Sequence, residues 1–285
     1  MEQEAAAMTN RNFSLCVAAV AFVLLIFCIV LIATDRDSAQ NGVHPVWQLP
    51  VSGISYITID NHGDHLRIEN EGRAGWTLTV PGDIPYDRSL VLALPLTLAN
   101  LTAENEFFAG SEARTSEYGF DDPVEIRVYP KTGMMQKLLL GSVNPPGDIR
   151  YFSIGDGKTY TMDITKSNTL ALNSLNIRDK NVLRLNRTLR PDDIAARITN
   201  ITLNGNSSPE LAGAIARVTA QEFLAVSGYD EFGLEPPRYT IVFTTENGVR
   251  TLYIGNITDD GECFYAATAE DTAIFTVSRR GFESL

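Results

Sequence analysis

Residues 117–151 read EYGFDDPVEIRVYPKTGMMQKLLLGSVNPPGDIRY, and residues 231–265 read EFGLEPPRYTIVFTTENGVRTLYIGNITDDGECFY. The two stretches align without a gap and keep most of their glycine, proline and aromatic positions. A match of this kind indicates a duplicated structural unit. The motif residues of the repeat are Tyr118, Gly119, Pro123, Gly141 and Tyr151 in the first copy and Phe232, Gly233, Pro237, Gly255 and Tyr265 in the second.

Each copy begins with a turn of the pattern E-[YF]-G-[FL]-[DE]-x-P. Glycine adopts positive φ without steric cost, and proline stiffens the entry to the segment that follows. Runs rich in β-branched and aromatic residues come next, separated by turn-forming residues. We therefore expect consecutive hairpins, in the first copy over 124–129, 135–140, 149–154 and 159–164.

Apolar residues at helical spacing precede each repeat. They predict a helix over 86–103 in the first copy, kinked or broken at Pro95, and a helix over 207–226 in the second. Three strand-like runs between residues 54 and 80 lead into the first helix, and one run over 194–203 leads into the second.

An apolar run lies near the N-terminus. Residues 13–34 contain no charged side chain, and as a helix they would span roughly 33 Å, enough for a hydrocarbon core of ~30 Å. We predict a transmembrane helix that acts as a signal anchor; a cleaved signal peptide and a buried core helix are the alternatives. Arg11 before the run and Arg36 after it, between two aspartates, give a slight preference for a cytoplasmic N-terminus.

These patterns predict an α+β fold with a single N-terminal transmembrane helix and two related units, each a helix packed on an antiparallel β-meander. A polar segment broken by glycine and proline follows the apolar run and is typical of a tether. The predicted organisation is a short tail over 1–12, the transmembrane helix over 13–34, a tether over 35–52, a first unit over 53–185 and a second unit over 186–285.

The formal net charge of −12 argues against two classes of partner. An acidic surface repels the phosphates of nucleic acid and also an anionic lipid surface. Cysteine usage is sparse: Cys16 and Cys28 lie in the apolar run and Cys263 is alone in the remaining chain. No disulfide can form within that part, so it folds by burying a hydrophobic core.

The order of segments resembles that of a known family. An apolar anchor, an I-x-x-I-x-I strand from Ile54, GWTLTVP, a helix, EYGFDDP, KLLLG and RYFSI follow one another, and this order resembles the bacterial domain of unknown function 4340 family over most of 53–285. The resemblance implies a membrane-anchored extracytoplasmic protein, often encoded beside ABC-transporter permease and auxiliary subunits of the gliding-motility type. It implies no catalytic residues, and the acidic, lysine-poor N-terminal tail departs from it.

Two short motifs suggest chemistry but have simpler explanations. Gly157-Lys158-Thr159 matches the end of a phosphate-binding loop, yet Phe152 stands where that loop needs a glycine, and a strand follows instead of a helix. We interpret the segment as a hairpin turn. The side chains within 62–65 (His-Gly-Asp-His) include three potential metal ligands, but a site needs another ligand and the one remaining histidine is His44. Turn chemistry explains that segment as well.

Nucleophilic and carboxylate chemistry is also weakly supported. Cys263 would need a histidine base, and it aligns with Ile149 of the other copy, which indicates a packed strand residue. The acidic pairs lie beside proline or glycine in expected turns; they are Asp121/Asp122, Asp192/Asp193 and Asp259/Asp260. We therefore expect no catalytic, cofactor or metal site and do not expect an enzyme.

The function indicated is binding or assembly: an extracytoplasmic accessory protein associated with an ABC-type transport or gliding-like complex. Exposed sheet edges suit contact with another chain by strand addition. An envelope ligand-binding module with a site between the two units is the alternative. An extracytoplasmic hydrolase is a remote third possibility.

Overall fold

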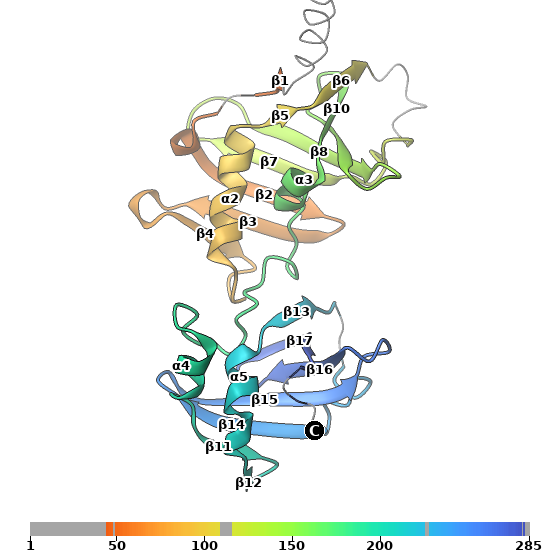
Figure 1. Cartoon of the computed structure of the whole chain (residues 1–285). Helices are drawn as coiled ribbons and strands as arrows, with labels where there is room; N and C mark the ends of the chain where they lie inside the picture. Colours follow the sequence, from red (N-terminus) through yellow and green to blue (C-terminus); the bar gives the residue numbers. More distant parts are fainter. Residues whose placement is uncertain (1–43, 48, 109–115, 226–227, 281, 283–285) are drawn as a thin grey trace, which may run out of the picture.

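The computed structural model describes residues 44–47, 49–108, 116–225, 228–280 and 282. Antiparallel strands predominate in these residues and form two large sheets, one in each of two units that follow one another along the molecule (Figure 1). A separate two-stranded ladder pairs β1 (His44–Pro45) with β5 (Thr102–Ala103).

The first sheet has eight strands in the order β4-β3-β2-β7-β8-β9-β10-β6, and every pair is antiparallel. Its strands are β2 (Ile54–Asn61), β3 (Asp64–Asn70), β4 (Trp76–Val80), β6 (Asn105–Phe108), β7 (Val124–Pro130), β8 (Gln136–Val143), β9 (Ile149–Ser153) and β10 (Lys158–Asp163). Single 3-10 turns precede β2 and β4, at η1 (Val51–Gly53) and η2 (Gly72–Ala74). Strands β7 to β10 overlap the four hairpin ranges predicted from the sequence.

The second sheet has seven strands in the order β12-β11-β14-β15-β16-β17-β13. They are β11 (Thr199–Leu203), β12 (Asn206–Ser207), β13 (Ala220–Phe223), β14 (Tyr239–Thr245), β15 (Gly248–Ile257), β16 (Cys263–Thr268) and β17 (Asp271–Ser278). Six strands correspond between the sheets: the order 2-7-8-9-10-6 in the first matches 11-14-15-16-17-13 in the second. The two units therefore share one topology.

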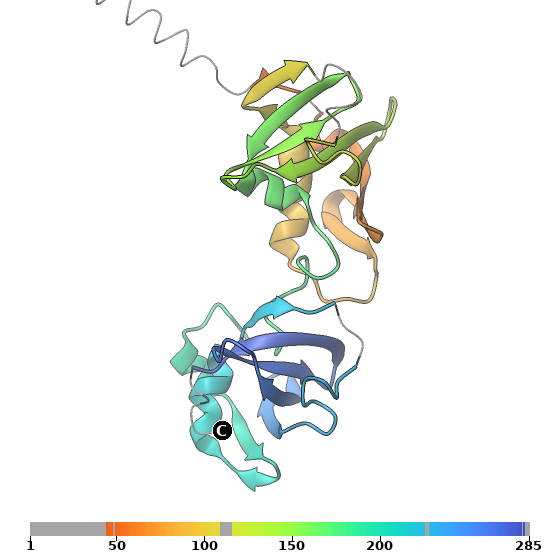
Figure 2. The ribbon, with the colours of Figure 1, turned by 90° about the vertical axis from the view of Figure 1, so that its right-hand side faces the viewer.

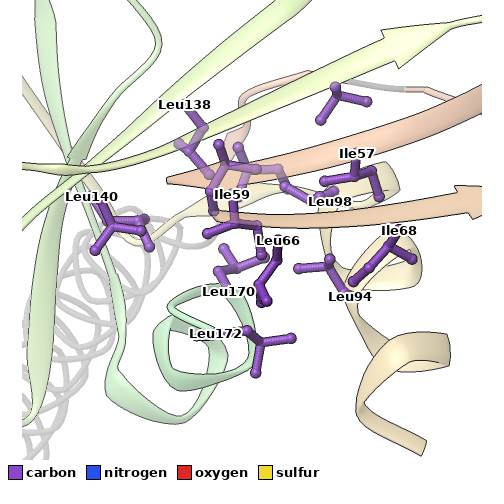
Figure 3. Packing of buried hydrophobic residues seen from close by; sticks show 14 of the residues in the cluster. Ile57, Ile59, Leu66, Ile68, Leu94, Leu98, Leu138, Leu140, Leu170 and Leu172 are labelled. Carbon is purple, nitrogen blue, oxygen red and sulfur yellow. The ribbon is translucent and has the colours of Figure 1, made fainter. Parts of the chain in front are cut away.

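The first core forms because strand residues alternate between two faces. In β7, Val124, Ile126 and Val128 are buried and the residues between them are not. This face packs against α2 (Arg88–Ala99) and α3 (Ile164–Leu170), which lie on one side of the sheet (Figure 2). Figure 3 shows the contact, with strand and helix side chains meeting at Ile57, Ile59, Leu66, Ile68, Leu94, Leu98 and Leu170, and with Leu172 from the segment that follows α3.

Helix α2 is shorter than the predicted range of 86–103 but continues through Pro95. Its N-terminus is capped by Asp87, whose carboxylate accepts a hydrogen bond of 2.8 Å from the Ser89 backbone N–H. Pro95 is buried, and burial of the helix's apolar face compensates for the hydrogen bond that proline cannot donate.

The predicted fold class is wrong. The described residues are mostly antiparallel strands rather than helix-on-meander units. The predicted helix over 207–226 is replaced by η4 (Pro209–Leu211), α5 (Ala212–Arg217) and strand β13. After Arg217 the chain pairs with β17, so sheet formation overrides the apolar helical pattern. Likewise β2 to β4 belong to the same sheet as β7 to β10.

The predicted transmembrane helix over 13–34 lies outside the described residues. None of the helices within the described ranges is both long and apolar enough to cross a membrane. The predicted tether over 35–52 is described from His44, and there it lies against the first unit. The Val46 N–H donates to Leu101 O at 2.9 Å, and the Trp47 indole N–H donates to Leu98 O at 2.5 Å.

The hydrophobic core is divided between the units. The first cluster of buried residues runs to Ile177, and the main cluster of the second unit begins with Leu183. In the second unit, α5 and α4 (Pro191–Ala195) cover one face of the sheet, with Ile215, Ile241 and Leu252 fully buried between them. The short connection between Ile177 and Leu183 brings the two units together.

Candidate functional site

The motif residues of the first repeat copy build a contact between the turn and the sheet. Gly119 has φ of 74°, and a Cβ there would lie 2.5 Å from Ser142 N. A Cβ on Gly141 would lie 2.0 Å from Tyr118 O. The Ser142 N–H donates to that same carbonyl at 2.8 Å. The turn and strand β8 thus touch backbone to backbone, which only glycine at both positions permits.

The second copy repeats this contact. Gly233 has φ of 67°, and a Cβ on Gly255 would lie 2.0 Å from Phe232 O. The Asn256 N–H donates to Phe232 O at 2.7 Å. One difference is that a Cβ on Gly233 would meet the Asn256 side chain, at 2.5 Å from Oδ1.

An aromatic pair accompanies each contact. The Tyr118 and Tyr151 rings lie 4.7 Å apart between centroids, and so do the Phe232 and Tyr265 rings. Pro123 immediately precedes β7, while Pro237 forms an isolated bridge with Leu234. In each copy, the two glycines and the two aromatic residues of the motif therefore lie together where the turn meets the sheet.

The potential metal ligands within 62–65 point to different partners. His62 Nδ1 lies 2.9 Å from Asp122 Oδ2, and His65 Nδ1 lies 3.4 Å from Asp60 Oδ2. Asp64 Oδ2 instead accepts hydrogen bonds from the Ser174 N–H and hydroxyl. The described part of the chain holds no group of three or more histidine, cysteine or acidic side chains placed to bind a metal.

The Gly157-Lys158-Thr159 segment is a turn and strand. Gly157 has φ of 81°, and the Lys158 backbone N–H donates to Asp156 Oδ1 at 3.1 Å in the turn between β9 and β10. The Lys158 Nζ lies 2.5 Å from Glu106 Oε1 across the edge pair β10–β6. That hydrogen bond raises the pKa of the lysine. Since the lysine faces a carboxylate, the segment is not arranged to bind phosphate.

Cys263 begins β16, and burial raises the pKa of its thiol, with smaller contributions from Asp260 and Glu262. The described histidine rings, those of His62 and His65, belong to the first unit instead. No histidine therefore stands beside this thiol among the described side chains.

The acidic pairs hold local structure. Asp260 Oδ1 accepts a 2.6 Å hydrogen bond from the Thr258 hydroxyl, which lowers the carboxyl pKa. Asp192 lies 3.1 Å from Arg217 Nη2, and Asp193 lies 3.2 Å from Arg190 Nε. These carboxylates accept hydrogen bonds within turns or form ion pairs, and they do not face one another across a cleft.

The junction between the units contains residues that sequence reasoning missed. Arg178 forms an isolated β-bridge with Tyr86, and the Asp179 N–H donates to Pro85 O at 3.1 Å. On the other side, Lys180 O accepts a 3.0 Å hydrogen bond from the Ala220 N–H of β13. The connection therefore adds backbone hydrogen bonds to both units at once.

An ion pair lies at the same place. Arg178 Nη1 is 2.8 Å from Asp271 Oδ2, and the two side chains are only 13% and 23% exposed. The guanidinium carbon also lies 5.5 Å from the centre of the Phe223 ring. Arg178 stands in a polar segment that looks like a solvated loop, so nothing in its neighbourhood indicates a partner 93 residues away.

A hollow of about 20 Å³ lies beside this ion pair, lined from both units by Pro85, Arg178, Asp179, Arg184, Arg250 and Glu270 among others. Arg250 is 15% exposed and pairs loosely with Glu270 at 3.4 Å. The Nε atoms of Arg178 and Arg250 are buried and have no hydrogen-bond partner among the described residues. Both atoms are closed off from solvent, and the hollow has room for about one water molecule.

Comparison with known proteins identifies a family but no function. The family model described as "Domain of unknown function (DUF4340)" matches residues 76–213 and 192–285. The first match begins at β4 and runs into α5 of the second unit, and the second match covers the second unit from α4 onward. Searches of curated proteins and of solved structures found no match to the chain.

Proposed function

The chain belongs to the DUF4340 family of domains of unknown function, and from that premise we propose that it is a membrane-anchored extracytoplasmic accessory protein of an ABC-type transport or gliding-like complex. The apolar run over 13–34 supplies the anchor. Proteins that resemble this chain are often encoded beside ABC permeases, which supports the choice of partner. In this role the chain binds and positions other subunits rather than performing chemistry.

The observation that carries the proposal is the free edge of the first sheet. Strand β4 reads WTLTV and pairs only with β3 among the described strands. Natural edge strands are commonly protected by charges or proline, and β4 contains neither. Apart from one register shift beside its Val80 end, its pairing with β3 is regular. Such an edge suits addition of a strand from another protein.

Affinity purification of the full-length chain from its native membrane, with mass spectrometry, tests the proposed partner. We expect an ABC permease and ATPase in stoichiometric yield. Thr77→Lys places a charge on β4 opposite Glu69 and should abolish the co-purification. Thr244→Lys is the matched control, because Thr244 is also a half-buried threonine but lies on β14, which is paired on both sides. A solitary protein in gentle detergent would contradict the proposal.

Cysteine labelling in intact cells tests the side of the membrane. Met134 is 88% exposed in the turn between β7 and β8, so Met134→Cys should react with a membrane-impermeant maleimide before lysis. The labelled peptide, identified by mass spectrometry, separates this site from the three natural cysteines. Labelling only after lysis would place the domain in the cytoplasm and refute the extracytoplasmic assignment.

A further inference from the structure

The end of the first unit that is remote from the second unit lies around β1 and β5 in Figure 1, and it carries an uncharged surface. A hollow of about 490 Å³ opens there, between the segment that enters the unit and the C-terminal end of α2. All of its lining residues are uncharged, although the chain has a net charge of −12. Trp47 is its largest lining side chain, and it is half-buried and fixed by the hydrogen bond to Leu98 O.

Helix α2 extends this surface. Leu92 is 46% exposed and Leu96 is 54% exposed, so both place large apolar side chains in solvent. They are four residues apart, and Asn100, four residues further, lines the hollow. Residues at this spacing share one helical face. We call these exposed residues together the Trp47 patch and define it by Pro45, Trp47, Leu49, Pro50, Leu92 and Leu96.

The position of the Trp47 patch along the chain limits what it can meet. Ten peptide steps separate His44, in β1, from Thr34 at the end of the apolar run. In any backbone conformation those two residues lie within about 36 Å of each other. If the apolar run is anchored in the membrane, as the proposed function states, the patch is held close to the bilayer surface at a high effective concentration.

We propose that the Trp47 patch docks on the outer surface of the lipid bilayer that anchors the chain. This inference rests on the proposed membrane anchoring and adds the contact surface and its partner. Tryptophan is favoured at the level of lipid headgroups because its ring is apolar and its N–H is polar. Exposed leucines on one helical face add apolar area that enters the headgroup and acyl boundary.

Charge around the patch is compatible with lipid. Arg88, the one charged residue of α2, lies at the opposite end of the helix from the hollow. The ammonium group of Lys166 reaches the rim, where it donates to the Thr102 hydroxyl at 2.8 Å. An uncharged surface with a cation at its edge suits zwitterionic phospholipid, whereas the acidic remainder of the protein stays away from the bilayer.

Fluorescence quenching in lipid nanodiscs tests the inference, because the chain has two tryptophans and Trp76 is only 8% exposed in the first core. The full-length chain is inserted in phosphatidylcholine nanodiscs with or without bromine near the headgroup end of the acyl chains. We expect bromine to cause a roughly twofold loss of Trp47 emission. Trp47→Phe should leave only the emission of Trp76, and bromine should not change it.

A second variant tests the same contact without altering the reporter. Leu92→Asp with Leu96→Asp should restore most of the Trp47 emission, while the matched control Val249→Asp, at a 63% exposed residue of the second unit, should not. Unquenched Trp47 in a chain that co-elutes with the nanodiscs would overturn the docking inference and leave the anchoring intact. A chain that does not co-elute with them would instead refute the proposed anchoring, and the docking inference with it.

Discussion

Among single residues, the glycines of the repeat make the closest contacts, because glycine has no side chain. Gly141 and Gly255 lie in equivalent strands, β8 and β15, and each faces the carbonyl oxygen of an aromatic residue in the turn. The neighbouring glycines of those turns have positive φ. Backbone carbonyls cannot rotate away as a flexible side chain can, so these positions tolerate no Cβ.

Gly141→Ala and Gly255→Ala should therefore each destabilise the protein by about 3 kcal/mol, because the turn must separate from the sheet. Urea denaturation of the full-length chain followed by circular dichroism measures the change. Gly213→Ala is a control of opposite sign: Gly213 lies in α5, and its Cβ would meet only the end of the Arg217 side chain. It should be neutral or stabilising by up to about 1 kcal/mol. Equal effects at all three sites would disprove the contact model.

The thiol of Cys263 gives a second prediction at this scale. Burial raises its pKa, so at pH 8 less thiolate is present than in an exposed cysteine, and alkylation by iodoacetamide should be slower than that of a cysteine peptide. Glu262→Gln removes one of the negative charges that raise the pKa and should increase the rate. Site-resolved mass spectrometry follows Cys263 separately from the other two cysteines. A rate equal to that of the free peptide would contradict the raised pKa of the Cys263 thiol.

Among the helices and strands, α2 has an almost uniformly apolar sequence, and its packing determines which of the apolar residues are buried and which are exposed. Val91, Leu94 and Leu98 are fully buried against the sheet, while Leu92 and Leu96 are exposed. Leu94→Ala should cost about 3 kcal/mol because it leaves a cavity in the first core. Leu96→Ala, two residues away in the same helix, should change the unfolding free energy by less than about 0.5 kcal/mol. If urea denaturation gives a similar loss of unfolding free energy for the two variants, the Leu96 side chain is covered by another part of the protein.

The edge strands show what the sequence patterns could not indicate. Strand β6 reads NEFF and β13 reads AQEF, and neither was predicted. Four residues are too few for a clear alternation, and the second of these strands continues an apolar pattern of helical type. Each becomes a strand because the last hairpin of its unit, ending in β10 or β17, presents an unpaired edge to it. Pairing to a distant segment determined these elements.

At the scale of the whole molecule, two cores are joined by a short connection. The two tryptophans report only on the first unit, whereas circular dichroism reports on both. Phe243 is fully buried in the second core. Phe243→Ala should destabilise that unit by about 4 kcal/mol and leave the urea midpoint of tryptophan fluorescence unchanged.

In this variant the circular dichroism transition should separate from the fluorescence transition. If both transitions instead shift together, the junction around Arg178 couples the units into one cooperative structure. Leu94→Ala provides the reciprocal control. It should shift the urea midpoint of tryptophan fluorescence and leave the circular dichroism transition of the second unit unchanged.

Sequence patterns were sufficient to indicate the features that depend on neighbouring residues. The alternation of β7 and the turn glycines indicated hairpins, and the gap-free repeat indicated two related units whose strand orders correspond. These features are local because side-chain direction and turn geometry depend on a few consecutive residues. The same local reasoning overestimated helix in the second unit and led to the wrong fold class.

Which distant segments meet became apparent from the three-dimensional fold. Three features join segments that are far apart in the chain: the Arg178–Asp271 ion pair, the hollow beside it and the Trp47 patch. No pattern of neighbouring residues indicates any of them. Chain topology brings such residues together, and packing then determines whether a leucine or an arginine is buried or exposed. The periodicity of a sequence can indicate that one face of a helix or strand is apolar. It does not indicate which other part of the molecule covers that face.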